Sequence, residues 1–174
     1  MCSGNGTNFQ NIVTNPVCNT NEVVLMIHNT KHCGAVKRAA KFGIPHVRVA
    51  HKEEDQMIKL FETWRVDLIV LAGYMRVLKN PSNFPCPIIN IHPSLLPKYK
   101  GLHAIEQALD SGDKVTGVSV HYVNEELDGG EIILQQEVPI LPNDNIDSLT
   151  KAIQRIEYGI LPAAIEHVKH KLQK

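Results

Sequence analysis

Two side chains suited to acyl-group chemistry stand two residues apart, where an apolar segment runs into a proline-bounded loop. Asn90 and His92 belong to the segment INIHPSLLP, in which Pro93 and Pro97 end the strand and stiffen the loop. Alternate side chains of a β-strand point to one face, so both residues would meet the same ligand. An amide donor beside a titratable imidazole can hold a carbonyl oxygen and move protons. From these residues alone, a loop-capping Asn90 and a packed His92 remain the alternative.

Asp128, in the segment ELDGG, has two interpretations. Asp-Gly is favoured at the turn of a β-hairpin, which makes Asp128 a turn residue. Alternatively, its carboxylate lies near the imidazole of His92, stabilises the protonated ring and accepts a proton. His121, on the segment before the turn, is interpreted as a structural or supporting histidine.

A short glycine-rich loop, Ser3-Gly4-Asn5-Gly6-Thr7-Asn8, precedes a segment compatible with a helix. Glycines allow a close approach of the backbone, and helix N-terminal amides favour a phosphate. Phe9 stands where a dinucleotide fingerprint needs its third glycine, and no GK[ST] follows, so a dehydrogenase and a Walker loop are excluded. A monophosphate site and a simple turn both remain open.

The remaining histidines and the cysteines show no spacing typical of metal ligands, and we expect no metal. There is neither a CxxC pair nor an HExxH segment among them. A disulfide framework is equally unexpected, which favours a reducing compartment. No apolar segment approaches the ~20 residues that span a bilayer, and the start MCSGNGTNF is not a signal peptide. We therefore expect a cytoplasmic protein that does not bind a membrane.

The composition is that of an ordinary globular protein. The 174 residues include 18 Lys plus Arg and 18 Asp plus Glu, so the formal net charge is zero. Sequence-independent nucleic-acid binding needs a basic excess, so no nucleic-acid partner is expected. With no repeat or linker, residues 1–174 are predicted to form a single domain.

Short apolar segments alternate with amphipathic ones along the first half of the chain. Strands are predicted at residues 22–28, 46–50, 66–72 and 87–91, and helices at residues 33–42 and 53–64. This alternation predicts an α/β, doubly wound, mostly parallel sheet of the Rossmann-like class. Ligands of such sheets bind beyond the carboxyl ends of the strands, which is where the motif segments fall.

The second half has a different pattern. Polar and apolar residues alternate over 115–123 and 131–138, which predicts a β-hairpin around Asp128-Gly129. A long helix over 145–170 follows, with a kink expected at Pro162. Only Met1 and Cys2 precede the glycine-rich loop, so the first strand of a doubly wound sheet is expected to be missing, through an upstream start or a truncation.

Four segments, taken together and in order, resemble the folate-dependent formyltransferase family, and within it the phosphoribosylglycinamide formyltransferases. They are GNGTN, AGYMRVL, INIHPSLLPKYKG and GVSVHYVNEELDGGEII, and the likeness runs from Ser3 to about Glu166. The resemblance implies transfer of a formyl group from 10-formyltetrahydrofolate to the amine of 5′-phosphoribosylglycinamide, in de novo purine biosynthesis. It implies small-molecule partners, no metal, and a monomer or homodimer.

The resemblance also implies roles for individual residues. Asn90, His92 and Asp128 are implied as catalytic; Gly6, Thr7, Asn8, Gln154 and Glu157 as substrate-binding; Met75, Arg76 and Leu78 as folate-binding; and Ser119 and His121 as supports of the carboxylate. Backbone groups of ELDGG would contact the pterin. The segment 49–56 diverges from the family, and Lys52 is its candidate for the folate tail.

Rival functions share the fold. A formyltetrahydrofolate hydrolase would not need GNGTN and usually carries an extra N-terminal region. A methionyl-tRNA formyltransferase would need an RNA-binding domain and more basic charge. A non-catalytic, truncated member of the family is the alternative of another class.

Overall fold

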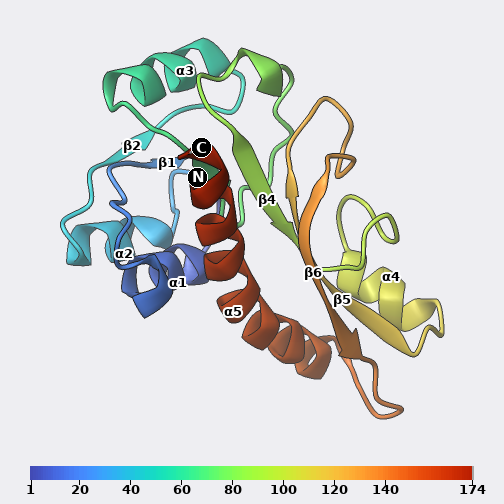
Figure 1. Cartoon of the computed structure of the whole chain (residues 1–174). Coiled ribbons are helices and arrows are strands. Elements are labelled where there is room, and N and C mark those ends of the chain that lie inside the picture. Colours follow the sequence, from blue (N-terminus) through green and yellow to red (C-terminus); the bar gives the residue numbers. More distant parts are fainter. Residues whose placement is uncertain (174) are drawn as a thin grey trace. The chain divides into compact units, whose positions relative to one another are not determined.

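The computed structural model describes residues 1–173, and its contacts divide the chain into two compact units, Met1–Asn90 and Ile91–Lys174 (Figure 1). The elements of the first unit are α1 (Thr7–Thr14), η1 (Pro16–Cys18), β1 (Met26–His28), α2 (Ala35–Lys41), β2 (His46–Arg48), α3 (Glu54–Thr63), β3 (Ile69–Leu71), η2 (Pro81–Asn83) and the first part of β4 (Ile88–His92). The second unit carries the end of β4, α4 (Ala104–Asp110), β5 (Val115–Tyr122), β6 (Ile132–Pro139) and α5 (Ile146–Leu172).

The strands of the first unit form two parallel pairs. Strand β1 pairs with β2, with Met26 opposite His46, and β3 pairs with β4, with Ile69 opposite Ile88. Parallel neighbours joined through helices confirm the predicted α/β pattern. Strands β1 and β3 are shorter than predicted, because the apolar segments begin several residues before pairing does.

Residues 1–3 hydrogen-bond to both strand pairs of the first unit. The N–H of Cys2 donates to the carbonyl of Ile27 at 2.9 Å, and Cys2 forms a parallel bridge with His28. On the other side, the N–H of Ala72 donates to the carbonyl of Met1 at 3.0 Å. These residues thus lie where a doubly wound sheet places its first strand, although they are too few to be assigned as one.

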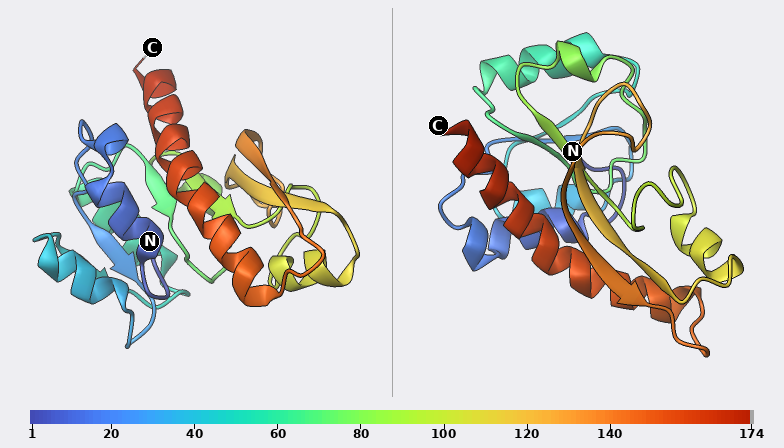
Figure 2. Two further views of the ribbon diagram at one scale, coloured as in Figure 1. Left: turned by 90° about the horizontal axis from the view of Figure 1, so that it is seen from below. Right: turned by 45° about the vertical axis from the view of Figure 1, so that its right-hand side comes forward.

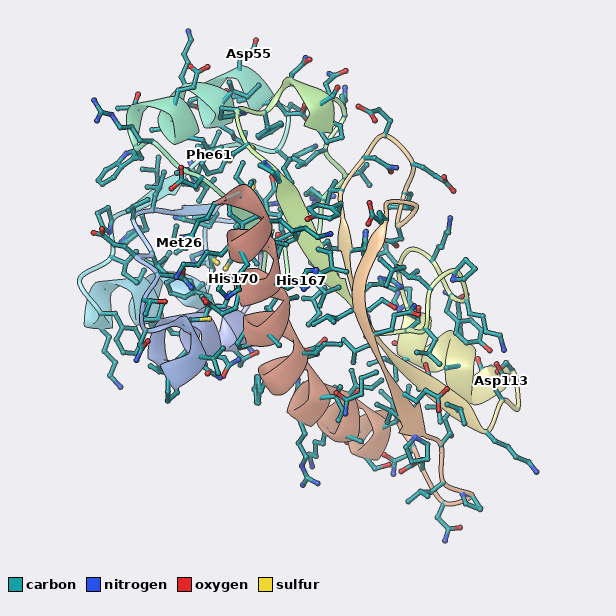
Figure 3. All side chains as sticks on the ribbon, viewed as in Figure 1. Met26, Asp55, Phe61, Asp113, His167 and His170 are labelled. Carbon is teal, nitrogen blue, oxygen red and sulfur yellow. The ribbon has the colours of Figure 1, made fainter. Side chains whose placement is uncertain are left out.

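Helix α3 shows the predicted amphipathic pattern. Met57 and Phe61 are buried, one turn apart, whereas Asp55 projects outward from the same helix (Figure 3). Trp64, which continues the predicted apolar stripe, is 40% exposed because the helix ends at Thr63.

The second unit confirms the predicted hairpin and long helix. Strands β5 and β6 are antiparallel, with Val115 opposite Pro139, and α5 contacts both strands and α4 (Figure 2). Helix α5 begins with a capping box between Asn145 and Ser148 and continues through Pro162. Helix α4 was not predicted; it has only seven residues and begins after His103, whose φ of 60° is left-handed. Within residues 1–173, no helix has the length and apolar character to cross a membrane.

Candidate active site

Strand β4 positions Asn90 and His92. Asn90 pairs with Leu71 of β3, and His92 is the last residue of the strand. Their separation of two residues places both side chains on the same face of β4. The buried His92 directs Nε2 at the carbonyl oxygen of Tyr99, 2.7 Å away. A carbonyl only accepts, so Nε2 carries the proton and donates it, and Nδ1 is left for Asp128.

Asp128 lies between two imidazoles in the second unit. Its Oδ2 is 3.5 Å from Nδ1 of His92, and its Oδ1 is 3.5 Å from Nε2 of His121. The N–H of Gly101 donates to Oδ2 at 2.8 Å. The carboxylate side chain is only 8% exposed, so these contacts act with little competition from water.

The surroundings of Asp128 favour its ionised form. Burial acts to raise the pKa of this carboxyl group. The hydrogen bonds from His121 and the Gly101 amide, together with the charge of the two histidine rings, outweigh burial, and the pKa of Asp128 lies below its ordinary value of 3.8.

The two histidines and Asp128 form a coupled set of proton sites. Nδ1 of His121 donates to the carbonyl of Tyr122 at 2.8 Å, just as Nε2 of His92 donates to Tyr99. Each ring therefore uses one N–H on the backbone, and the nitrogen facing Asp128 carries a proton only when that ring is a cation. An ionised Asp128 can accept such a hydrogen bond from either ring.

The turn that carries Asp128 unites its two interpretations. Asp128 has a φ of 48°, in the left-handed region that aspartate tolerates, and the N–H of Gly129 donates to the carbonyl of Glu126. A Cβ on Gly130 would stand 1.8 Å from the carbonyl oxygen of Tyr122, so only glycine fits there. Asp128 is a turn residue, and that turn directs its carboxylate at His92.

Ser119 fixes the loop that follows His92. This side chain is fully buried; its Oγ donates to the carbonyl of Ser94 at 2.6 Å and accepts from the N–H of Leu96 at 3.0 Å. Gln135 donates to the same oxygen at 2.8 Å. Ser119, together with Gln135, therefore connects β5 and β6 to the loop between His92 and Tyr99, whose carbonyl accepts a hydrogen bond from His92.

Replacing Ser119 with alanine is expected to lower the free energy of unfolding by about 1–3 kcal/mol, because the Leu96 N–H and the Ser94 carbonyl lose a buried partner. Urea unfolding of both proteins gives the difference. Thr116→Ala is the matched control, since its buried hydroxyl has no hydrogen-bond partner among residues 1–173. Equal losses in the two variants would show that the Ser119 bonds do not stabilise this loop.

The loop before α1, where the sequence predicts a phosphate site, is shaped by a glycine and held by an arginine. Gly6 has a φ of 72°, and a Cβ there would stand 2.5 Å from Cβ of Ala35, so the position requires glycine. Arg38 holds the loop by donating from Nε to the carbonyl of Asn5 at 2.7 Å. Helix α1 begins at Thr7, so the backbone N–H groups of its first turn, which the helix cannot use itself, include those of Thr7 and Asn8.

The segment after β3 is held at both ends within the first unit. The N–H of Met75 donates to Oγ of Ser3 at 2.9 Å, and the buried Glu54 accepts from the N–H groups of Lys79 and Asn80 at 2.6 and 3.2 Å. Ser3 also donates to Asn29 after β1 at 2.7 Å, so it joins the segments that follow β1 and β3. Met75 is 61% exposed, whereas the Leu78 side chain is buried.

Glu54→Gln is expected to lower the free energy of unfolding by about 1–3 kcal/mol, because an amide offers one acceptor oxygen where the carboxylate offers two. Chemical unfolding measures the change. The exposed neighbour Glu53 supplies the control, and Glu53→Gln is expected to change stability by less than about 0.5 kcal/mol. A Glu54 variant as stable as the control would contradict this role.

The structure brings only part of the predicted site together within one unit. Asp128 lies within 3.5 Å of both His92 and His121, and Ser119 of β5 bonds to the loop after His92. Gln154 and Glu157 lie one turn apart on α5, both partly buried. Arg76 and Lys52 are exposed in the first unit. In the part of the chain that the structure describes, no three His, Cys, Asp or Glu side chains are grouped to hold a metal ion.

Sequence reasoning missed the backbone partners of the cluster. The carbonyl of Tyr99 determines which ring nitrogen of His92 carries the proton, and the N–H of Gly101 helps to keep Asp128 ionised. Any residue type supplies such backbone groups, so the sequence does not reveal them. Two left-handed residues, Tyr99 and Gly101, with φ of 54° and 78°, shape this loop. Of the two, only the glycine is a residue type that indicates a left-handed backbone in the sequence.

Comparison with known proteins identifies the family. The formyl transferase model matches residues 1–165. The chain is 40% identical to the trifunctional purine biosynthetic protein adenosine-3 of Drosophila melanogaster, over 95% of this chain but 13% of that protein. It is 38% identical to the phosphoribosylglycinamide formyltransferase of Haemophilus influenzae, over 95% of this chain and 84% of that protein.

A solved structure gives the same result. The crystal structure of phosphoribosylglycinamide formyltransferase from Anaplasma phagocytophilum is similar at a TM-score of 0.88 and 35% identity, over 94% of this chain and 82% of that chain. The match confirms the predicted α/β formyltransferase fold, and the family model covers residues of both compact units. The chain belongs to the formyl transferase family.

Proposed function

We propose that this chain transfers the formyl group of 10-formyltetrahydrofolate to the amine of 5′-phosphoribosylglycinamide, a reaction of purine biosynthesis. The observation that carries the proposal is the buried Asp128 carboxylate held between His92 and His121. Support comes from relatives named phosphoribosylglycinamide formyltransferase, of which this chain covers more than four fifths.

The reaction needs a stabilised oxyanion and a proton path. The uncharged substrate amine attacks the formyl carbon, a C–N bond forms, and the carbonyl oxygen becomes an oxyanion. Asn90 donates an N–H to that oxygen, and the positive charge of a protonated His92 ring stabilises it. The tetrahedral intermediate then releases the folate nitrogen, which takes up a proton as the former amine loses one. One well-placed donor is worth about 10²–10³ in rate.

Asp128 carries the proton between the two nitrogens. Its lowered pKa keeps it ionised, so it can take a proton from the attacking amine, directly or through water. It then gives that proton to the leaving folate nitrogen, which returns Asp128 to its ionised form between the two rings. His121 positions the Asp128 carboxylate, and Ser119 positions the loop after His92.

Binding of the two substrates divides among the remaining predicted residues. Backbone N–H groups at Gly6, Thr7 and Asn8 bind the substrate phosphate at the start of α1. Gln154 and Glu157, one turn apart on α5, bind the same substrate.

Folate contacts come from the segment after β3 and from the turn of the hairpin. Met75 and Arg76 are exposed and available to a ligand, whereas the buried Leu78 would contribute its backbone. The backbone of ELDGG contacts the pterin, and the exposed Lys52 reaches the folate tail. The chemistry requires no metal, because the folate itself carries the one-carbon unit. A cytoplasmic monomer or homodimer fits these small-molecule substrates.

An assay of tetrahydrofolate release tests the proposal. The purified chain is mixed with 10-formyltetrahydrofolate, with and without phosphoribosylglycinamide. Release that depends on the second substrate is the expected result. Equal release in both mixtures would favour a hydrolase, and no release in either would favour a non-catalytic member of the family.

A further inference from the structure

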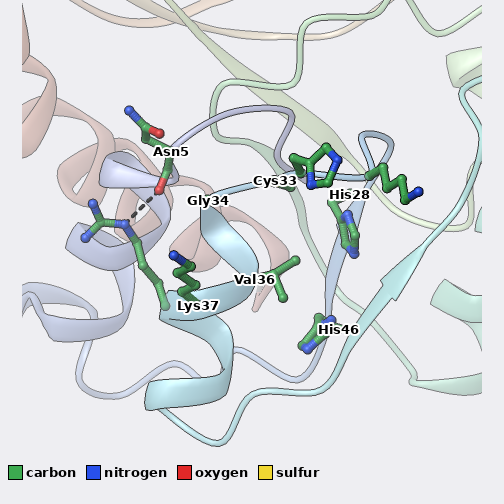
Figure 4. A pocket seen from close by; sticks show the side chains of 10 residues that line it. Asn5, His28, Cys33, Gly34, Val36, Lys37 and His46 are labelled. Atoms are coloured by element: carbon green, nitrogen blue, oxygen red, sulfur yellow. Dashed lines mark hydrogen bonds between the residues drawn. The ribbon is translucent and has the colours of Figure 1, made fainter.

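A pocket of about 690 Å³ lies beside α2 in the first unit, at the carboxyl end of β1 (Figure 4). Of the loop before α1, only Gly4–Asn5 approaches it, with Asn5 in the lining; Gly6, Thr7 and Asn8 do not line it. The pocket is therefore separate from the groups proposed to bind the substrate phosphate. Ligands of α/β sheets gather at this edge, which gives the pocket a favourable place in the fold.

The charged residues that line the pocket are all cationic. Lys31, Lys37 and Arg38 line it, and no aspartate or glutamate does. Across residues 1–173, none of these three side chains has a carboxylate within 4.0 Å. Arg38 donates instead to two neutral oxygens, the carbonyl of Asn5 and Oε1 of Gln10. Three uncompensated cations around one cavity create a positive potential that attracts an anion.

A buried imidazole adds an independent sign of a ligand. His28, at the end of β1, is only 6% exposed, and its Nδ1 donates to the carbonyl of Thr30 at 2.9 Å. The ring belongs to the pocket wall (Figure 4). With the proton on Nδ1, its Nε2 is an acceptor, to which an N–H or O–H of a ligand in the pocket could donate.

The remaining lining suits a ligand larger than a bare anion. The rings of His28 and His46 lie 5.9 Å apart at 54°, and Val36 adds an apolar side chain (Figure 4). A phosphate offers several oxygens to cationic donors, whereas imidazole rings and Val36 can contact a flat organic group.

We propose that this pocket binds a small phosphate-bearing molecule, with Lys37 and Lys31 as donors to the phosphate and Nε2 of His28 as an acceptor for an N–H or O–H of the same molecule. The site is additional to the formyl-transfer site and does not depend on the proposed reaction. Arg38 supports it by holding the backbone of Asn5 at the pocket edge.

Backbone amide NMR of the whole chain tests the proposal, because it reports each loop separately. AMP, inorganic phosphate and adenosine are titrated into the wild-type chain. AMP and phosphate are expected to shift the signals of residues 31–38 in a saturable way, and adenosine is not. Signals of residues 6–8 report any binding at the other phosphate loop.

Two variants decide whether the pocket side chains carry the binding. Lys37→Ala is expected to weaken AMP binding at residues 31–38 by about ten-fold, whereas Lys59→Ala, which removes an exposed lysine of α3, leaves it unchanged. Shifts confined to residues 6–8, adenosine binding as tight as AMP binding, or unchanged affinity in Lys37→Ala would each overturn the proposal.

Discussion

Replacing Asp128 with asparagine is expected to slow formyl transfer by about 10²–10⁴-fold, with the chain still folded. Asparagine keeps the shape of the side chain and tolerates the φ of 48°. Its oxygen can still accept from the Gly101 N–H at the 2.8 Å position. The variant therefore removes the charge and the proton-accepting group but not the turn.

The effect should fall on kcat more than on KM, because Asp128 acts on a proton that moves during the reaction. Steady-state rates with both substrates varied give this split. The matched control is Glu126→Gln, which removes an exposed carboxylate from the same turn. A loss below ten-fold in Asp128→Asn, or an equal loss in Glu126→Gln, would contradict the role of Asp128.

Acid unfolding supplies a check on the charge state. Because the folded-state pKa of Asp128 is lowered, its stabilising contribution is present above the ordinary value of 3.8 and is lost as the pH falls through the folded value. The stability difference between wild type and Asp128→Asn should thus narrow under acid conditions. Urea midpoints at neutral and acid pH measure it, and a difference independent of pH would show that Asp128 is not ionised in the folded chain.

Replacing His92 with glutamine is also expected to slow transfer by about 10²–10⁴-fold. The glutamine amide can still donate to the Tyr99 carbonyl, as Nε2 of His92 does at 2.7 Å. Glutamine has no ring that can become a cation next to Asp128. The variant therefore loses the positive charge that stabilises the oxyanion. The comparison therefore separates positioning of the loop from proton chemistry.

The double variant shows whether His92 and Asp128 work as one unit. Groups in one proton-sharing unit lose their effect together, so His92→Gln combined with Asp128→Asn should be about as slow as the slower single variant. Single-turnover rates of the four proteins complete the cycle. Losses that multiply would mean that the two residues act independently, despite the 3.5 Å between Nδ1 and Oδ2.

The periodic parts of the fold could be predicted from the sequence. The apolar segments located β1 through β4, and the alternation around Asp128-Gly129 located the hairpin. Boundaries differed by up to four residues, as at β1, because pairing begins only where a partner strand lies alongside. Helix α4, which follows the left-handed residue His103, was not predicted.

The sequence predicted the side chains of the candidate site but not its backbone groups. His92, Asp128 and His121 were named from their motifs, and the structure places them in contact range. The Tyr99 carbonyl and the Gly101 amide were not predictable, because backbone groups leave no trace in residue type. The cationic pocket beside α2 was equally invisible, since its lining comes from segments whose proximity only the fold creates.

The most direct test of the central claim follows the formyl carbon itself. The chain is incubated with phosphoribosylglycinamide and 10-formyltetrahydrofolate carrying an isotope label on the formyl carbon, and the label is located by NMR. The proposed function predicts that the label appears in the new amide of the glycinamide product and that Asp128→Asn slows its appearance. Label found in free formate, or label that stays on the folate, would contradict it.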